Sequence, residues 1–217
     1  MALTLIIGNK NYSSWSLRPW IAMRQAGIEF TEEAIPLYQP GSRERILKYS
    51  PAGKVPVLFD GDMVIWESLA ILEHLAERFP ASGLWPREPA ARAHARAMGA
   101  EMHAGFAALR NHCPMNMRRP PKARALTPEV AEDVKRIEAI WADSRACFGR
   151  SGPFLLGGFC AADAMYAPIV SRFSSYAIPV GAPARAYMQT MMGLPVWNEW
   201  AAAAAVEPLV IPGNELD

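Results

Sequence analysis

The sequence has 217 residues, 51% of them hydrophobic and 20% charged, which is the composition of an ordinary globular protein. Because 22 Lys and Arg face 21 Asp and Glu, the net charge of +1 gives no electrostatic reason to expect nucleic acid or an anionic membrane as the main partner. No apolar run approaches the roughly 20 residues of a membrane span, and the first residues lack the pattern of a signal peptide. We therefore expect a cytoplasmic protein.

The spacing of cysteine and histidine points away from disulfide and metal chemistry. Cys113, Cys147 and Cys160 are an odd number of cysteines, far apart in the chain and without a Cys-x-x-Cys pair. The four histidines show neither a His-Glu-x-x-His run nor another ligand spacing. We expect three free thiols in a reducing compartment and no metal site.

The first 80 residues predict a small mixed α/β domain with the element order βαβαββα. Pro19 lacks an N–H, so we expect it in the first turn of the first helix, with Ser16 as the N-cap. Asp60-Gly61 between two apolar runs predicts a β-hairpin, because glycine supplies the positive φ of such a turn. The expected elements are a strand at 3–8, a helix ending near residue 27, a strand at 30–35, a short helix near 43–49, strands at 55–59 and 63–66, and a helix at 67–78.

The character of the sequence changes after Pro80. Residues 81–89 are interpreted as a linker, and strand signals almost vanish beyond them, so residues 90–217 should form an all-helical domain. Thr127 followed by Pro128 is typical of a helix start. The expected helices are 92–111, 127–148, one from about 160 that Pro168 interrupts or kinks, 183–192 and 196–205.

Three hydroxyl side chains, Tyr12, Ser13 and Ser14, lie just before the first helix. Hydroxyls at this place can donate hydrogen bonds to a bound thiolate, and the helix dipole favours negative charge there. A free thiol has a pKa of about 8.5, and each unit of depression needs about 1.4 kcal/mol, which one or two donors plus a dipole can supply. The alternative is a polar loop that only caps the helix.

Glu67 and Ser68 open the last helix of the first domain. A helix N-terminus suits a carboxylate ligand, a serine adds a donor, and an acidic side chain can receive an ammonium group. The pair could therefore hold the headgroup of an α-amino acid. Alternatively, these residues only cap their own helix.

Lys54-Val55-Pro56 leads into an apolar strand. Proline at the first residue of a strand can be a device that protects a sheet edge. It can also follow a cis peptide bond, which would expose the neighbouring backbone N–H and C=O to an extended ligand. The sequence leaves both interpretations open.

Three segments together resemble the glutathione S-transferase family in order and spacing, ahead of an all-helical second half. They are Ser13-Ser14-Trp15-Ser16-Leu17-Arg18, Lys54-Val55-Pro56-Val57-Leu58 and Glu67-Ser68-Leu69-Ala70-Ile71-Leu72. The resemblance covers essentially the whole chain. It implies a thioredoxin-like N-terminal domain that binds glutathione, residues 1–80, and a helical domain that shapes the pocket of the second substrate.

The resemblance also implies which hydroxyl stabilises the thiolate. The nearest match is to the serine-type members, in particular the zeta class (maleylacetoacetate isomerase), which carry a serine five residues before an arginine. In this sequence the serine five residues before Arg18 is Ser13, with Ser14 as the neighbouring alternative and Tyr12 as a distant third.

The same resemblance assigns the rest of the glutathione site. It implies that Val55 pairs its backbone with the cysteinyl part of glutathione across a cis bond to Pro56. Lys54 would approach the glycyl carboxylate, while Glu67 and Ser68 would hold the γ-glutamyl end.

Trp15 stands where the zeta pattern has cysteine, which weakens an isomerase assignment and argues against glutathione-dependent disulfide chemistry. We expect Tyr12 and Trp15 to line the pocket of the second substrate. From the first long helix of the second domain and the residues after it, Met102, Phe106 and Met115 are further candidates, although such apolar residues are more often plain core.

The helical half departs from the family at one point. The usual Ser/Thr-x-x-Asp capping box is represented by Cys160 and Asp163, so a thiol replaces the hydroxyl, and we take Asp163 as structural. The basic stretch 118–124 is interpreted as a solvated loop, with an anion site for an acidic substrate as the alternative.

The expected function is that of a detoxifying glutathione S-transferase, in which a serine hydroxyl stabilises the glutathione thiolate for attack on a small electrophile. One alternative is a glutathione-dependent cis-trans isomerase of a small unsaturated diacid of the maleylacetoacetate type. Another is a non-catalytic protein that binds glutathione or regulates a partner. The resemblance also implies a homodimer.

Overall fold

The computed structural model describes residues 2–216, and its strands form a sheet in the order β2-β1-β3-β4. Strand β1 (Leu3–Ile7) pairs in parallel with β2 (Phe30–Ala34) and antiparallel with β3 (Val57–Asp60). Strand β4 (Met63–Trp66) completes the hairpin with β3. The hairpin predicted from the Asp-Gly turn is therefore confirmed.

The alternation of side chains along β1 buries both faces of the sheet. Leu5 packs in the large core with helices α1 (Ser14–Gln25) and α3 (Ser68–Arg78). Ile6 points the other way and packs with Ile46 of helix α2 (Ser42–Leu47). The order is thus β1-α1-β2-α2-β3-β4-α3, which confirms the predicted α/β arrangement.

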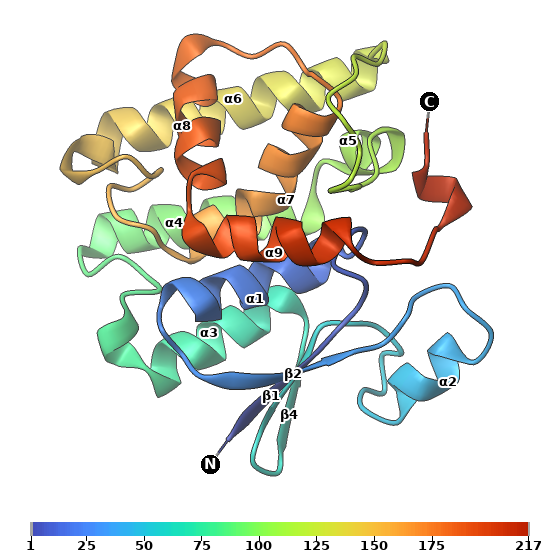
Figure 1. Ribbon diagram of the computed structural model, residues 1–217. Coiled ribbons are helices and arrows are strands. Elements are labelled where there is room, and N and C mark those ends of the chain that lie inside the picture. The colour runs from blue at the N-terminus through green and yellow to red at the C-terminus, as the bar shows by residue number, and fades with distance from the viewer. Residues whose placement is uncertain (1, 217) are drawn as a thin grey trace.

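The second half of the chain is built of helices, as predicted. Figure 1 shows α4, α7 and α9 above α1 and α3, on the side of these helices that faces away from the sheet. The remaining elements are η1 (Pro80–Ser82), α4 (Pro89–Ala104), α5 (Ala107–His112), α6 (Pro128–Phe148), η2 (Gly149–Ser151), α7 (Ala161–Ser175), α8 (Ala182–Met192), α9 (Pro195–Ala205) and η3 (Pro212–Asn214).

Helix α1 begins earlier than expected, and Ser16 is not its N-cap. Ser13 occupies the N-cap position, and Pro19 lies inside the helix, where its missing N–H removes a single backbone hydrogen bond. The loop before α1 already makes a helix-like turn, because the Ser13 N–H donates to the carbonyl oxygen of Asn9, four residues earlier, at 2.8 Å. Ser16 instead accepts a hydrogen bond from the backbone N–H of Gly8 at 3.0 Å.

The single helix predicted for 92–111 is two helices, α4 and α5. The chain breaks at Gly105 and Phe106, and Phe106 has a left-handed backbone with φ of 58°. A Cβ on Gly105 would lie 2.7 Å from the carbonyl oxygen of Glu101, so only glycine fits there. After the break, α5 packs against α6.

Helix α7 starts at a buried carboxylate. The side chain of Asp163 accepts hydrogen bonds from the backbone N–H groups of Cys160 at 2.9 Å and Leu155 at 3.1 Å. Burial penalises the charged form and raises the pKa of Asp163 to about 6, although the two N–H donors act in the opposite direction. Asp163 thus joins the loop before α7 to the first turn of the helix.

We expect the difference in unfolding free energy between the wild type and Asp163→Asn to depend on pH. Because the folded pKa of about 6 exceeds the ordinary value of 3.8, the folded state binds this proton more tightly than the unfolded state. The contribution of Asp163 therefore falls by up to about 3 kcal/mol as the pH rises from about 4 to about 7. Urea unfolding of both proteins across this range measures it. A constant difference would contradict the assignment.

Candidate functional site

A cavity of about 1020 Å³ lies where the β1–α1 loop faces the C-terminal ends of α4 and α5. Its size is at the upper end of the range for small-molecule sites. It brings together eight of the nine predicted site residues, namely Tyr12, Ser13, Ser14, Trp15, Lys54, Val55, Pro56 and Glu67. Ser68, the ninth, is fully buried and does not line the cavity.

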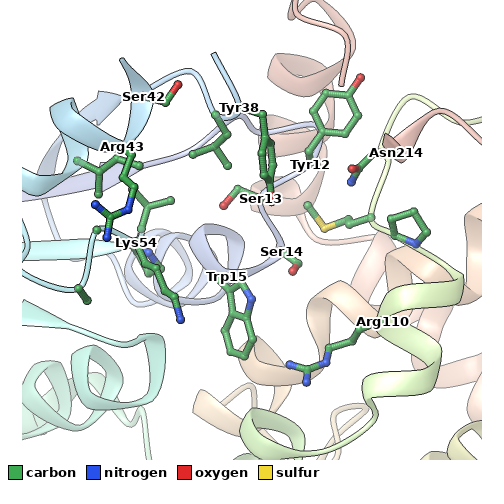
Figure 2. Close-up of a pocket in the computed structure, with 18 of the residues that line it drawn as sticks. Tyr12, Ser13, Ser14, Trp15, Tyr38, Ser42, Arg43, Lys54, Arg110 and Asn214 are labelled. Carbon is green, nitrogen blue, oxygen red and sulfur yellow. The ribbon is translucent and has the colours of Figure 1, made fainter. Parts of the chain in front are cut away.

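The two serine hydroxyls point to different parts of this cavity. Figure 2 shows the Ser13 hydroxyl on the side of Lys54 and Arg43, and the Ser14 hydroxyl on the side of Arg110. Both serines are less than one-tenth exposed. Their position at the first residues of α1 places them at the positive end of the helix dipole.

Tyr12 has its ring in the cavity wall but its hydroxyl elsewhere. The hydroxyl accepts a hydrogen bond from Arg118 at 2.7 Å and donates to the carboxylate of Glu215. Arg118 also donates to the carbonyl oxygen of Leu209 at 3.0 Å. Part of the basic stretch 118–124 therefore holds the C-terminal segment in place, a role that neither sequence interpretation included.

The wall from the first domain contains residues 54–56, just before β3. The peptide bond between Val55 and Pro56 is cis, as the resemblance implied. Lys54 precedes it, and Arg43 of α2 lines the same part of the cavity. Figure 2 shows both cationic side chains on one side of Ser13. The sequence analysis did not predict Arg43 as a site residue. The segment around it has no pattern that indicates which side chains of the short helix α2 face the cavity.

Glu67 has an unusual backbone at the start of α3. Its φ is 69°, a region that costs a residue with a side chain about 1–3 kcal/mol. The carboxylate makes no capping hydrogen bond to α3, so capping does not explain this residue. The buried hydroxyl of Ser68 has no hydrogen-bond partner among the described residues. Of the two residues, Glu67 lines the cavity and its carboxylate is available to a ligand there.

Arginines from the helical half line the opposite wall. Arg172 of α7 is 4% exposed, and burial first, then repulsion from Arg110, lowers its pKa to about 10. Arg110 of α5 also lines the cavity, and burial lowers its pKa as well. Arg18 of α1 is fully buried, with its guanidinium 4.0 Å from the centre of the Trp15 ring.

His103 of α4 connects the two walls. Its Nε2 lies 3.6 Å from the Glu67 carboxylate, and its ring meets the Trp15 ring at 5.2 Å between centroids. Burial and the neighbouring Arg18 lower the pKa of His103, while Glu67 opposes them. The imidazole therefore favours the neutral form.

Sequence reasoning did not single out His103, Arg110 or Arg172. Arg172 could have been found from the sequence, because a single arginine in a mostly apolar helix indicates a buried charge with a specific role. Of the apolar candidates, Met115 lines the cavity, whereas Met102 and Phe106 lie in the core.

Residues 2–216 contain neither a membrane-spanning helix nor a metal-binding cluster. No helix in this range is both long enough and apolar enough to cross a membrane. Within the same range, no cluster of three or more His, Cys, Asp or Glu side chains is arranged to hold a metal ion.

Comparison with known sequences identifies the first domain. Residues 12–78 match the family model of the glutathione S-transferase N-terminal domain. A probable maleylacetoacetate isomerase of Caenorhabditis elegans is 35% identical over 99 residues, 46% of each chain. A maleylacetoacetate isomerase of Pseudomonas aeruginosa is 28% identical over 148 residues, 63% of this chain and 69% of that protein. The chain spans less than half the length of the first curated relatives it matches.

Comparison with solved structures covers nearly the whole chain. A glutathione transferase homologue from Burkholderia, solved with bound glutathione, superimposes with a TM-score of 0.70 at 18% identity, over 94% of this chain and 98% of that one. At this level of identity the likeness concerns the fold, which is the predicted α/β domain followed by a helical domain.

Proposed function

Because residues 12–78 match the family model of the glutathione S-transferase N-terminal domain, we propose that the chain activates glutathione as a thiolate and conjugates it to a small electrophile. The observation that carries this proposal is the position of the Ser13 hydroxyl, at the N-terminus of α1 and in the wall of a large cavity. Residues 1–80 bind glutathione in this proposal, and residues 90–217 shape the pocket of the electrophile.

The glutathione tripeptide fits the first-domain wall group by group. Its glycyl carboxylate pairs with Lys54, beside Arg43, and its cysteinyl backbone pairs with Val55 next to the cis bond. Its γ-glutamyl ammonium pairs with the Glu67 carboxylate, which no capping hydrogen bond occupies. The γ-glutamyl carboxylate lies at the N-terminus of α3, where the helix dipole favours negative charge.

Ser13 acts as a hydrogen-bond donor and not as a nucleophile. A hydrogen bond to a charged acceptor contributes about 1.5–3 kcal/mol, which corresponds to a depression of the thiol pKa by about 1–2 units. Ser13 is chosen over Tyr12, because the Tyr12 hydroxyl is engaged by Arg118 and Glu215. It is chosen over Ser14, because the Ser14 hydroxyl faces Arg110, away from Lys54 (Figure 2).

We expect Ser13→Ala to raise the pKa of bound glutathione by about 1–2 units, since the thiolate loses a charge-assisted hydrogen bond. Glutathione affinity measured well below this pKa should change little, because the tripeptide keeps its other partners. Titration of thiolate absorbance against pH measures the pKa in the complex.

Ser14→Ala is the matched control for this experiment and should leave the thiol pKa within a few tenths of a unit. If Ser14→Ala raised the pKa and Ser13→Ala did not, the roles of the two serines would be reversed. If the wild type bound no glutathione, the proposed function would be wrong, and the protein would share the fold of glutathione transferases but not their activity.

A second candidate is a glutathione-dependent cis-trans isomerase of a small unsaturated diacid. The observation in its favour is the pair Arg110 and Arg172 in the wall opposite Lys54, since arginine binds carboxylates through two parallel hydrogen bonds. Two of the similar proteins are named maleylacetoacetate isomerase or probable maleylacetoacetate isomerase, which is consistent with this second candidate. The reaction would use the same thiolate and regenerate glutathione.

We expect Arg110→Gln to raise KM about 10- to 100-fold for an unsaturated substrate with a carboxylate, because a charge-assisted hydrogen bond is lost. KM for the matching methyl ester should change less than about twofold. Steady-state kinetics with both substrates, and with glutathione recovery measured, distinguish isomerase from transferase. An equal change for acid and ester would mean that Arg110 does not bind the carboxylate.

We also propose a homodimer in which the first domain of one subunit meets the second domain of its partner. β4 forms an edge of the sheet, and its Met63 and Trp66 are 53% and 43% exposed. Light scattering should give about twice the 23.9 kDa of one chain. Trp66→Lys should reduce this mass, whereas Val206→Lys, at an exposed apolar residue elsewhere, should not. A monomeric wild type would contradict the proposal.

A further inference from the structure

Ser16 lies directly behind Ser13 in the first turns of α1. It is fully buried, and its Oγ is 2.8 Å from the Oγ of Ser13 and 3.0 Å from the backbone nitrogen of Gly8. Ser16 does not line the cavity, and the family resemblance assigns no function to it. The three groups form a short chain from the end of β1, through the interior, to the cavity wall.

The hydrogens in this chain can be counted. The Gly8 N–H can only donate, so it occupies one lone pair of the Ser16 oxygen. The two serine hydroxyls share one hydrogen bond, so one of their two hydrogens enters it and the other must find a different acceptor. The direction of this shared bond decides where the remaining hydrogen goes.

Burial decides the direction. Among the described residues, the Ser13 oxygen is the one acceptor within reach of the Ser16 hydroxyl. If Ser13 donated to Ser16, the Ser16 hydrogen would be left without a partner in a fully buried position, which carries a desolvation penalty. If Ser16 donates to Ser13, the Ser13 hydrogen is free to point into the cavity that Ser13 lines.

We propose that Ser16 is a positioning residue that donates to Ser13 and so directs the Ser13 hydroxyl hydrogen at the glutathione thiolate. This inference rests on the proposed function of Ser13. The chain runs from Gly8 N–H to Ser16 to Ser13 to sulfur, with every donor oriented the same way. Hydrogen bonds in such a chain polarise one another, by about 10–30% per bond, so Ser13 becomes a better donor to the thiolate.

The close approach that this chain requires depends on Gly8. A Cβ on Gly8 would lie 3.1 Å from the Cβ of Ser13 and 2.6 Å from the side chain of Leu37. Glycine therefore lets the end of β1 come within hydrogen-bond distance of Ser16 while α1 begins close by. The arrangement is a property of the β1–α1 connection and not of Ser13 alone.

The test compares the thiol pKa of bound glutathione in Ser16→Ala, Ser13→Ala and the double variant. We expect Ser16→Ala to raise this pKa by about 0.5–1 unit, which is about a 3- to 10-fold loss of thiolate at a pH below it, with glutathione affinity for the thiol form within about twofold of the wild type. In the Ser13→Ala background, Ser16→Ala should have no further effect, because the group through which Ser16 acts is gone.

Two further variants separate positioning from a structural role. Ser16→Cys keeps the size of the side chain but is a poor donor, so it should fold and still raise the thiol pKa. Ser16→Thr keeps the hydroxyl and should restore a pKa close to that of the wild type. Urea unfolding reports the stability of each variant separately.

The outcomes distinguish this inference from the proposed function. A pKa that is unchanged in Ser16→Ala and Ser16→Cys, while Ser13→Ala raises it, would overturn the role of Ser16 alone. An effect of Ser16→Ala that persists undiminished without Ser13 would also overturn it. A pKa that does not respond to Ser13→Ala would instead overturn the proposed role of Ser13.

Discussion

Burial of α1 on two sides fixes the position of every group at its N-terminus. It packs against α3 of the first half of the chain and against α7 and α9 of the second half. Trp20 meets Trp200 of α9 at 5.0 Å between ring centroids, and the Trp200 indole donates to the carbonyl oxygen of Lys10 in the preceding loop. Nine of its twelve residues are buried, Ser14 and 16–23, so the helix depends on the elements that cover it. Because both halves of the protein hold α1, the loop before it opens into the cavity between them.

The charges around this cavity are arranged unequally. Cationic side chains line both ends, Lys54 and Arg43 from the first domain and Arg110 and Arg172 from the second, whereas Glu67 is the one carboxylate among the described lining residues. Burial lowers the pKa of both Arg110 and Arg172, and repulsion from Arg110 lowers that of Arg172 further. A ligand with net negative charge would compensate it, and glutathione in its thiolate form is such a ligand. The same field acts on any second substrate that carries a carboxylate.

The C-terminal segment completes the cavity and holds the loop before α1 from outside. The Glu207 carboxylate accepts hydrogen bonds from the backbone N–H groups of Lys10 and Asn11. Asn214 lines the cavity beside Tyr12, whose hydroxyl is engaged by the same segment (Figure 2). The end of the chain thus takes up the hydroxyl of Tyr12 and leaves the two serines as the hydroxyl donors of the α1 N-terminus.

The sequence by itself determined the elements whose signals are local. The Asp60-Gly61 turn, the apolar run of β1 and the Thr127 cap of α6 depend on neighbours a few residues away, and all three are present. The sequence motifs also predicted eight residues that line one cavity. This was possible because the spacing of these motifs is typical of a known fold. Only the tertiary structure decided the break at Phe106, the cationic wall of Arg110 and Arg172, and the contact of Ser16 with Gly8 and Ser13. The reason is physical: local hydrogen bonding and periodicity select helices and strands, whereas the partners of a buried polar group are set by which distant segments pack against it.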